Sequence, residues 1–295
     1  MKNNEIDRLN DKMEYYKGCP EGTYAEALDA MKGTQVNSCL TSSLPLAEFW
    51  QPKNLARINA ILLGRLPKLD LYTASKFLEF PTRAVIGGEP RGPESMTDLM
   101  IIDGSRRKIA VEGKFTEYVW GPSETCEEWL RRNSRRTGKI DCYWEILFAW
   151  LGMIRDAGCT DLSNPELVSS SVNVCYQFLH RAASACFGTN GTEGRQPVLL
   201  YQLFYKAGDG AHEEKLKEFK WQLLAWADRL HLKNMKFLIL SVPVRNADEV
   251  ERRYERLKEQ ENARIFEDMK HGPVFDFDFE RIELENVKLL EEGER

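Results

Sequence analysis

Two acidic residues and a lysine in the first half of the chain have types and spacing that could support chemistry on a phosphate group. Glu112-Gly113-Lys114 ends an apolar run, and Asp98 stands fourteen positions before Glu112. A hard divalent cation takes carboxylate oxygens as ligands, and a lysine beside them can orient or acidify a water molecule. These residues predict a site in which Asp98 and Glu112 hold Mg²⁺, or Mn²⁺ in its place, with Lys114 beside the reacting water.

An acid two positions before a lysine is common by chance, so the local context must decide. Four such triplets occur, and they begin at Glu112, Glu213, Glu218 and Asp268. The last three lie in charge-dense segments that are typical of solvated surface. Only Glu112 ends a strand-like run that follows another strand-like run carrying an acid. The alternative is a half-exposed hairpin whose Glu112 and Lys114 merely flank each other in solvent.

A predicted β-hairpin positions these residues. Residues 96–102 and 108–114 are apolar runs, and the segment between them contains a glycine, which is typical of two antiparallel strands joined by a turn. Because side chains alternate along a strand, Glu112 and Lys114 are expected to point to the same face. Gly113 keeps the opposite face of the strand small.

Periodicity predicts helices and strands on both sides of the hairpin. Helices are expected at 1–16, 23–31, 46–63, 72–80, 144–154, 172–187, 213–230 and 247–270. Further strands are expected at 83–88, 196–206, 236–242 and 274–279, the last as an edge strand. An antiparallel hairpin beside strands joined through helices indicates an α/β protein with a central mixed β-sheet flanked by helices.

The order of these elements, with an acid in the second strand and an acid-x-lysine in the third, resembles the PD-(D/E)xK nuclease superfamily. The similarity covers residues 70–245, although threonine stands before Asp98 where the motif has proline. The resemblance implies a restriction-endonuclease-like core and a metal-dependent nuclease that hydrolyses phosphodiester bonds, with DNA as the expected partner. Asp98, Glu112 and Lys114 would be its catalytic residues, and the two acids would hold the metal.

The same resemblance implies a further metal ligand. Nucleases of this fold often take another acid from the first core helix, and Glu79, near the end of the helix expected at 72–80, is the candidate. Glu48 is a more distant substitute, and Glu94 lies near the site in sequence but on an expected loop. A solvated carboxylate at a helix end is an equally simple interpretation of Glu79.

Polar residues in the helix expected at 172–187 are a second supporting group. Asn173, Gln177 and Arg181 are spaced to share one face, which resembles the polar helix residues that some members of the superfamily aim at the site. The alternative is the wet face of an otherwise apolar helix. His180 has no cluster of partners in the sequence and is interpreted as a packed or hydrogen-bonded residue.

A cluster of positive charge follows the hairpin. Its members are Arg131, Arg132, Arg135, Arg136 and Lys139. Such a cluster can bind the phosphates of a nucleic acid. The alternative is a solvated helix end neutralised by neighbouring acids, which are Glu124, Glu127 and Glu128.

The expected organisation has three parts. Residues 1–69 form a helical amino-terminal region, 70–245 form the nuclease core, and 246–295 form a carboxy-terminal helix and edge strand. A helical insertion at 121–165 carries the positive cluster and an apolar helix, so it is a candidate for recognition or for contact in a homodimer.

Composition limits the class of protein. The 295 residues are 42% hydrophobic and 29% charged, and the net charge of -5 argues against a protein that coats nucleic acid non-specifically. The seven cysteines have no zinc-type spacing, and the sequence has no secretory signal pattern. The most apolar segment is too short to cross a bilayer. We therefore expect a cytoplasmic protein with reduced cysteines and no membrane partner.

Two other functions stay open at this stage. One is a nuclease-fold module that no longer cuts and instead binds nucleic acid or serves in assembly. The other is a small-molecule or nucleotide hydrolase on an unrelated α/β fold, which would have a defined pocket and no basic groove.

Overall fold

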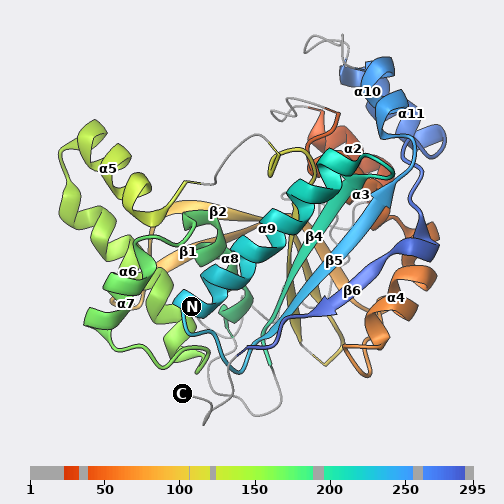
Figure 1. Ribbon diagram of the computed structural model, residues 1–295. Helices are drawn as coiled ribbons and strands as arrows, with labels where there is room; N and C mark the ends of the chain where they lie inside the picture. Colours follow the sequence, from red (N-terminus) through yellow and green to blue (C-terminus); the bar gives the residue numbers. More distant parts are fainter. Residues whose placement is uncertain are drawn as a thin grey trace.

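The computed structural model describes residues 23–32, 39–105, 107–119, 124–188, 196–254 and 262–289. Within these ranges the chain is an α/β protein, with a six-stranded mixed β-sheet flanked by helices on both faces (Figure 1). The helix expected at 1–16 lies outside the described residues.

The strands follow one another across the sheet in chain order. They are β1 (Ser75–Ile86), β2 (Glu89–Ile102), β3 (Lys108–Lys114), β4 (Val198–Lys206), β5 (Lys236–Val244) and β6 (Glu283–Asn286). The pairs β1–β2, β2–β3 and β5–β6 are antiparallel, whereas β3–β4 and β4–β5 are parallel. β4 and β5 are buried on both faces, which explains why they read as continuous apolar runs.

Helices cover both faces of the sheet. One face carries α2 (Tyr24–Met31), α3 (Ser43–Phe49), α4 (Leu55–Leu63), α10 (Ala247–Tyr254) and α11 (Asn262–His271). The other carries α5 (Cys126–Thr137), α6 (Ile140–Asp156), α8 (Tyr176–Cys186) and α9 (Gly210–Arg229), with α7 (Asn164–Ser171) beside α6 (Figure 1). Short 3₁₀ turns occur at η1 (Pro52–Asn54) and η2 (Phe279–Arg281).

The predicted hairpin is formed by β2 and β3. Leu99 pairs with Val111 in this antiparallel ladder. The turn is closed by Asp103, whose Oδ1 accepts the backbone N–H groups of Ser105 and Arg107, each at 2.9 Å. A short acidic side chain that satisfies local backbone donors is a strong turn former, so the connection stays tight.

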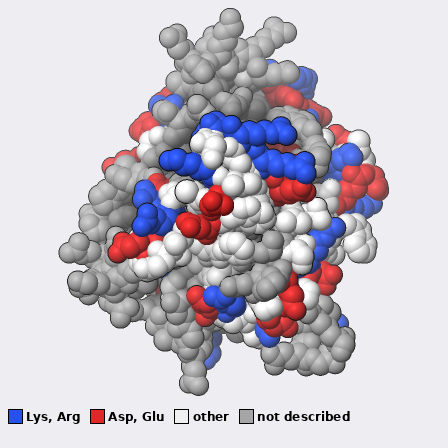
Figure 2. Space-filling model, turned by 90° about the vertical axis from the view of Figure 1, so that its left-hand side faces the viewer, with Lys and Arg blue, Asp and Glu red and all other residues white. Residues whose placement is uncertain are grey.

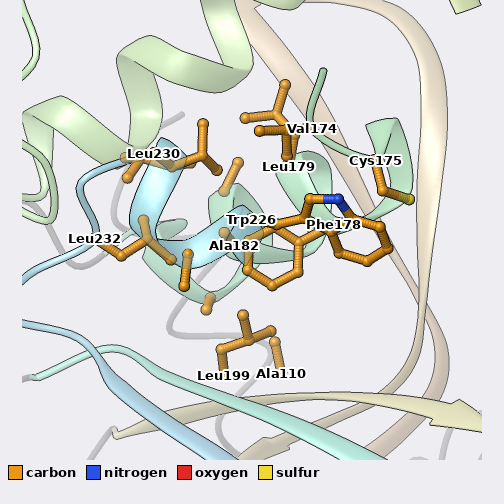
Figure 3. Close-up of a cluster of buried hydrophobic side chains, with 14 of the residues drawn as sticks. Ala110, Val174, Cys175, Phe178, Leu179, Ala182, Leu199, Trp226, Leu230 and Leu232 are labelled. Carbon is orange, nitrogen blue, oxygen red and sulfur yellow. The ribbon is translucent and has the colours of Figure 1, made fainter. Parts of the chain in front are cut away.

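The helix α8 is fixed on β3 and β4 by a buried apolar cluster (Figure 3). Phe178 and Ala182 of α8 are fully buried against neighbouring strand residues, Ala110 and Leu199, which pair with each other in the sheet. Trp226 of α9 closes the cluster, with its ring centroid 5.7 Å from that of Phe178. Burying a large apolar side chain contributes about 1.5–3 kcal/mol, so this packing strongly favours one position of α8.

The amino-terminal helices pack against the opposite face. Leu44, Leu46 and Phe49 of α3 share a buried cluster with Val111 of β3 and Leu240 of β5. Residues on both sides of the predicted boundary at 69–70 therefore contribute to one core, and the domain boundary itself stays a prediction.

The prediction of a helix at 72–80 is wrong, because residues 75–80 belong to the strand β1 and residues 72–74 precede it. The error has a physical cause in the backbone of Glu79, which has a φ of 54°. Phe77 and Phe80 lie in the same buried cluster with ring centroids 5.6 Å apart, although Leu78 between them faces the other cluster. A left-handed residue inside the strand breaks the alternation and gives apolar side chains three positions apart the same face, which mimics a helix.

The prediction of a loop around Glu94 is also wrong, because this residue lies within the strand β2. Gly87 and Gly88 alone form the turn between β1 and β2, with φ values of 60° and 84°. Two consecutive residues with positive φ are what a two-residue hairpin turn needs, and glycine adopts them without strain. The chain therefore passes directly from this turn into β2, which begins at Glu89.

The carboxy-terminal predictions are partly wrong. The long helix expected at 247–270 appears as α10 and α11, and the residues between them lie outside the described ranges. The segment expected as an edge strand, 274–279, makes only a single bridge, from Phe277 to Val244, and β6 is the edge strand. The carboxylate of Glu48 accepts the backbone N–H groups of Val274 and Phe275, which removes the need for a strand partner.

The buried Glu48 predicts a pH dependence of stability. Burial raises the pKa of Glu48 to about 7, although the bonds from Val274 and Phe275 oppose this shift. Because the folded-state pKa is raised, the contribution to stability is present at low pH and is lost as the pH rises through about 7. One pKa unit corresponds to about 1.4 kcal/mol, so the wild type should lose about 3 kcal/mol relative to Glu48→Gln between about pH 4.5 and pH 8.

Urea unfolding of both proteins across this range measures the difference. Glu145→Gln, which changes an exposed carboxylate of α6, is the control and should follow the wild-type curve. Parallel curves for the wild type and Glu48→Gln would contradict the burial of an ionisable Glu48.

Candidate active site

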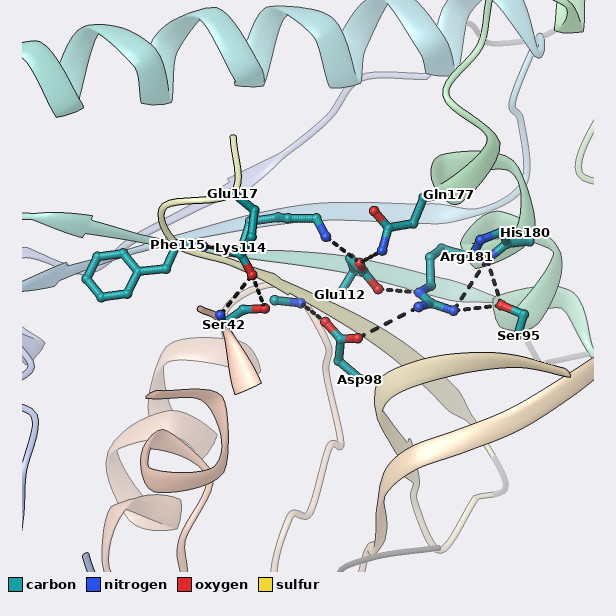
Figure 4. A network of polar contacts seen from close by, with 11 residues as sticks. Ser42, Ser95, Asp98, Glu112, Lys114, Phe115, Glu117, Gln177, His180 and Arg181 are labelled. Atoms are coloured by element: carbon teal, nitrogen blue, oxygen red, sulfur yellow. Dashed lines mark hydrogen bonds and ion pairs between the residues drawn. The ribbon is translucent and has the colours of Figure 1, made fainter. Parts of the chain in front are cut away.

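Polar side chains from β2, β3 and α8 meet on the face of the sheet that α8 covers (Figure 4). The strands supply Asp98, Glu112 and Lys114, and the helix supplies Gln177 and Arg181. The structure thus brings together the three residues singled out by spacing and two of the three polar residues expected on the helix.

Strand register places the two acids side by side. The last β2–β3 pair is Leu99 with Val111, so Asp98 and Glu112 occupy the next position on each strand. The backbone N–H of Gly113 donates to Asp98 Oδ2 at 2.8 Å and fixes that carboxylate. Lys114 points to the same side as Glu112, and its Nζ lies 2.8 Å from Glu112 Oε1.

Glu112 is fully buried and is surrounded by donors. Its Oε1 accepts hydrogen bonds from Lys114 Nζ and, at 2.6 Å, from Gln177 Nε2, whereas its Oε2 accepts from Arg181 Nε. Burial raises the pKa of Glu112, but Arg181 and Lys114 outweigh it and hold the pKa below its usual value. Glu112 is therefore an ionised carboxylate in the interior.

Asp98 and Lys114 complete the charged group. Burial and the neighbouring Glu112 raise the pKa of Asp98 well above its usual value, and Arg181 and Lys114 oppose this shift only in part. Burial lowers the pKa of Lys114, but Glu112 and Asp98 reverse this and leave the pKa above its usual value. The side chain of Asp98 is 20% exposed, so the network reaches solvent at this acid.

Ser95 and His180 hold the far end of Arg181. Arg181 Nη1 donates to Ser95 Oγ at 2.8 Å and lies 3.3 Å from His180 Nδ1. Ser95 Oγ and His180 Nδ1 are themselves 2.7 Å apart. Burial and the adjacent Arg181 keep the pKa of His180 well below its usual value, so His180 is a neutral partner. The prediction of a packed or hydrogen-bonded residue is confirmed.

The three candidates for a further metal-binding acid lie in different parts of the fold. Glu79 lies in β1 rather than at a helix end, and its charge raises the pKa of Asp98, which places it near the network. Glu94 pairs with Arg83 at 3.2 Å, and Glu48 lies on the opposite face of the sheet. These contacts of Glu94 and Glu48 lie outside the polar network.

Asn173 lies outside the polar network. It precedes α8, it is exposed, and its carbonyl oxygen accepts a hydrogen bond from Arg229 at 2.9 Å. The helix begins at Tyr176, so a helical face that includes position 173 does not exist.

The opposite face of β3 has a polar contact that the sequence did not reveal. Glu117 Oε1 accepts from the backbone N and the Oγ of Ser42, at 2.8 and 2.7 Å, and Glu117 Oε2 accepts from the backbone N of Phe115. This ties the residues after β3 to the start of α3. A serine directly before an apolar helical run was the only signal available.

The two acids of the network are ligands of the type that Mg²⁺ prefers. Among the described residues, no group of three or more His, Cys, Asp or Glu side chains converges on a metal position. Mg²⁺ is commonly bound by one or two carboxylates and keeps several waters, so Asp98 and Glu112 fit it in ligand type and number. Both oxygens of Glu112 already accept hydrogen bonds, so a metal ion would have to compete with these donors.

The positive cluster is split into two parts in the structure. All four arginines are exposed on α5, where Arg131 pairs with Glu127 at 2.5 Å and Arg132 with Glu124 at 2.8 Å. Arg135 and Arg136 form no ion pair with any residue in the described ranges. Figure 2 shows Lys and Arg side chains gathered in bands over the region of α5. The acidic neighbours thus pair with two of the four arginines.

The fold and the site define an α/β protein with a carboxylate–lysine–arginine network at the junction of β2, β3 and α8. Residues 25–236 match a protein-family model described as Domain of unknown function (DUF6946), and this match covers more than half of the chain. The chain therefore belongs to that family, and every residue of the network lies within the match. No curated protein and no solved structure matches the chain significantly. None of the described helices is long and apolar enough to span a bilayer.

Gly113 provides a test of the geometry on the far side of β3. A Cβ at this position would lie 3.1 Å from Ser42 Cβ and 3.5 Å from Leu46 Cδ1. Gly113→Ala should therefore push α3 from the strand and destabilise the fold by about 1–3 kcal/mol, measured by urea unfolding.

Gly152→Ala in α6 is the matched control, since its Cβ would meet only Arg155 Nη2 at 3.9 Å. This change should be neutral or stabilising by about 0.5–1 kcal/mol, because alanine favours a helix. Equal stability of Gly113→Ala and the wild type would contradict the close approach of α3 to β3.

Proposed function

We propose that this protein is a Mg²⁺-dependent nuclease with a restriction-endonuclease-like core, and that it hydrolyses phosphodiester bonds in DNA. The observation that carries the proposal is the meeting of Asp98, Glu112 and Lys114 on adjacent strands, next to polar residues of α8. The strand order supports it, because Asp98 lies in the second strand and Glu112 and Lys114 in the third, as in the order that carries the resemblance.

The chemistry requires an activated water and relief of negative charge on the phosphate. A Mg²⁺ ion, when bound, would lower the pKa of a coordinated water and polarise a phosphate oxygen. Asp98 and Glu112 would hold it, since they are adjacent acids and one of them reaches solvent. The ammonium of Lys114 carries positive charge and can orient the attacking water or stabilise the charge that develops on the phosphate.

Substrate binding is assigned to the helical insertion. Arg135 and Arg136 of α5 are exposed cations without ion pairs in the described part of the chain, so they are available to phosphates. Nucleic-acid binding through such contacts depends on salt, because each phosphate contact releases counterions.

Cleavage assays test the catalytic assignment. With Mg²⁺ or Mn²⁺, the wild type should cut at least one substrate among plasmid, linear duplex and single-stranded DNA. Asp98→Asn and Lys114→Gln should lower the rate by about 10²- to 10⁴-fold, since each removes a group that acts at the reacting centre. RNA in a parallel reaction shows whether the activity is specific for DNA.

Lys215→Gln is the matched control. Lys215 ends another acid-x-lysine triplet, on the surface helix α9, where it pairs with Glu218 at 2.6 Å. It should cut like the wild type. Full activity in folded Asp98→Asn and Lys114→Gln would refute the assignment, and so would a wild type that cuts none of the substrates.

The split of the positive cluster makes a separate prediction about DNA binding. Arg135→Gln/Arg136→Gln should weaken binding of a fluorescent DNA duplex and reduce the slope of log K against log salt by about 2. Arg131→Gln/Arg132→Gln should have a smaller effect, because these side chains already pair with Glu127 and Glu124. Fluorescence anisotropy at several salt concentrations measures both. Equal effects of the two double variants would contradict the prediction that the pairs with Glu127 and Glu124 weaken the contribution of Arg131 and Arg132 to DNA binding.

One observation favours a second candidate, a nuclease-fold module that binds nucleic acid or serves in assembly without cutting. The carboxylate of Glu112 already accepts hydrogen bonds from Lys114, Gln177 and Arg181, so its oxygens have partners without a metal. Such a module would bind DNA in the anisotropy experiment yet cut none of the substrates.

A further inference from the structure

Arg181 is a buried cation that reaches both carboxylates of the network. Its side chain is 5% exposed. Its Nε donates to Glu112 Oε2, and its Nη2 lies 3.7 Å from Asp98 Oδ1 (Figure 4). One guanidinium thus lies beside the two acids that the proposed metal would need.

The position of Arg181 is built by its surroundings. Neutral partners contact Nη1 of the guanidinium, which is not the atom that donates to Glu112. Ser95 Oγ accepts from Nη1 at 2.8 Å, and His180 Nδ1 is 3.3 Å from the same atom. Ser95 comes from β2, three positions before Asp98. The backbone of α8 is fixed by the packing of Phe178 and Ala182. Moving the guanidinium away from the carboxylates would therefore break these contacts and cost free energy.

Electrostatic repulsion determines whether a divalent ion and the Arg181 guanidinium can share the two acids. Two neighbouring acids in a buried site repel each other, and a cation between them relieves the repulsion. A divalent ion bound to the same oxygens would lie a few ångströms from the guanidinium, where like charges repel strongly because the interior screens them poorly. Metal and guanidinium are therefore alternative cations for one pair of acids.

We propose that Arg181 is an internal counter-ion that competes with the divalent metal for Asp98 and Glu112. The inference rests on the proposed function, because it takes these two acids as the metal ligands. It adds a regulatory property: the protein holds its acids in place without metal and binds metal weakly until the guanidinium leaves Glu112.

Calorimetric titration with Mn²⁺ alone tests the competition. Arg181→Met removes the charge but keeps much of the side-chain length, and it should bind Mn²⁺ at least tenfold more tightly than the wild type. Arg181→Lys keeps a cation and should remain close to the wild type. Arg155→Met, which changes an exposed arginine of α6 that pairs with Asp156, should leave the affinity unchanged.

Thermal unfolding provides a second measure that does not depend on catalysis. Without metal, Arg181→Met leaves the two acids without their guanidinium, and its Tm should fall by about 5–10 °C. Saturating Mn²⁺ should recover most of this loss and raise the Tm of the wild type less. If Arg181→Met does not fold, Ser95→Ala replaces it, since it keeps the guanidinium but removes the hydroxyl that accepts from Nη1 and contacts His180. That variant should bind Mn²⁺ more tightly by about two- to tenfold.

The outcomes separate the competition from the nuclease proposal. Mn²⁺ binding to the wild type with equal or weaker binding to folded Arg181→Met would overturn the competition and leave the metal site standing. If Arg181→Met does not fold, an unchanged affinity in Ser95→Ala would overturn it in the same way. Failure of the wild type and all folded variants to bind Mn²⁺ would overturn the competition and the proposed metal dependence together.

Discussion

The buried charge of Glu112 is the constraint on which the site depends. An isolated carboxylate in a protein interior costs several kcal/mol, and it persists only with close cations and hydrogen-bond donors. Glu112 meets this requirement through Lys114 on its own strand and through Arg181 and Gln177 on α8. The helix must therefore dock with both polar side chains over β3, and its apolar residues, Phe178 and Ala182, must fill the remaining space against β3 and β4. Packing and charge compensation specify the same position of α8.

The alternation of β3 lets one short strand serve both faces. Glu112 and Lys114 face α8, whereas Gly113 faces α3, where a Cβ would lie only 3.1 Å from Ser42 Cβ. The backbone N–H of Gly113 also fixes Asp98 on the neighbouring strand. Glu117 then joins the end of β3 to the start of α3. The polar network and the close approach of the amino-terminal helix thus depend on consecutive residues.

Local patterns in the sequence predict much of this arrangement. Apolar runs with turn residues between them indicated the β2–β3 hairpin and the strands β4 and β5, because buried strands leave a continuous apolar signal. The alternation of a strand sufficed to place Glu112 and Lys114 together. Three features were not accessible in this way. Glu79 has a left-handed backbone, which gives the apolar residues of β1 a spacing that resembles that of a helix. The donors of Val274 and Phe275 bond to Glu48, more than two hundred positions away. Ser95 and Arg181 are 86 positions apart, and their contact arises only when α8 docks on the sheet.

Metal binding by Asp98 and Glu112 can be observed through the anomalous scattering of Mn²⁺ in a crystal of the wild-type protein grown with Mn²⁺ and a DNA duplex. We expect an anomalous peak bound by the carboxylates of Asp98 and Glu112, with the guanidinium of Arg181 moved off Glu112. A peak that avoids both carboxylates, or none in a crystal whose Glu112 still holds Arg181, would contradict this expectation.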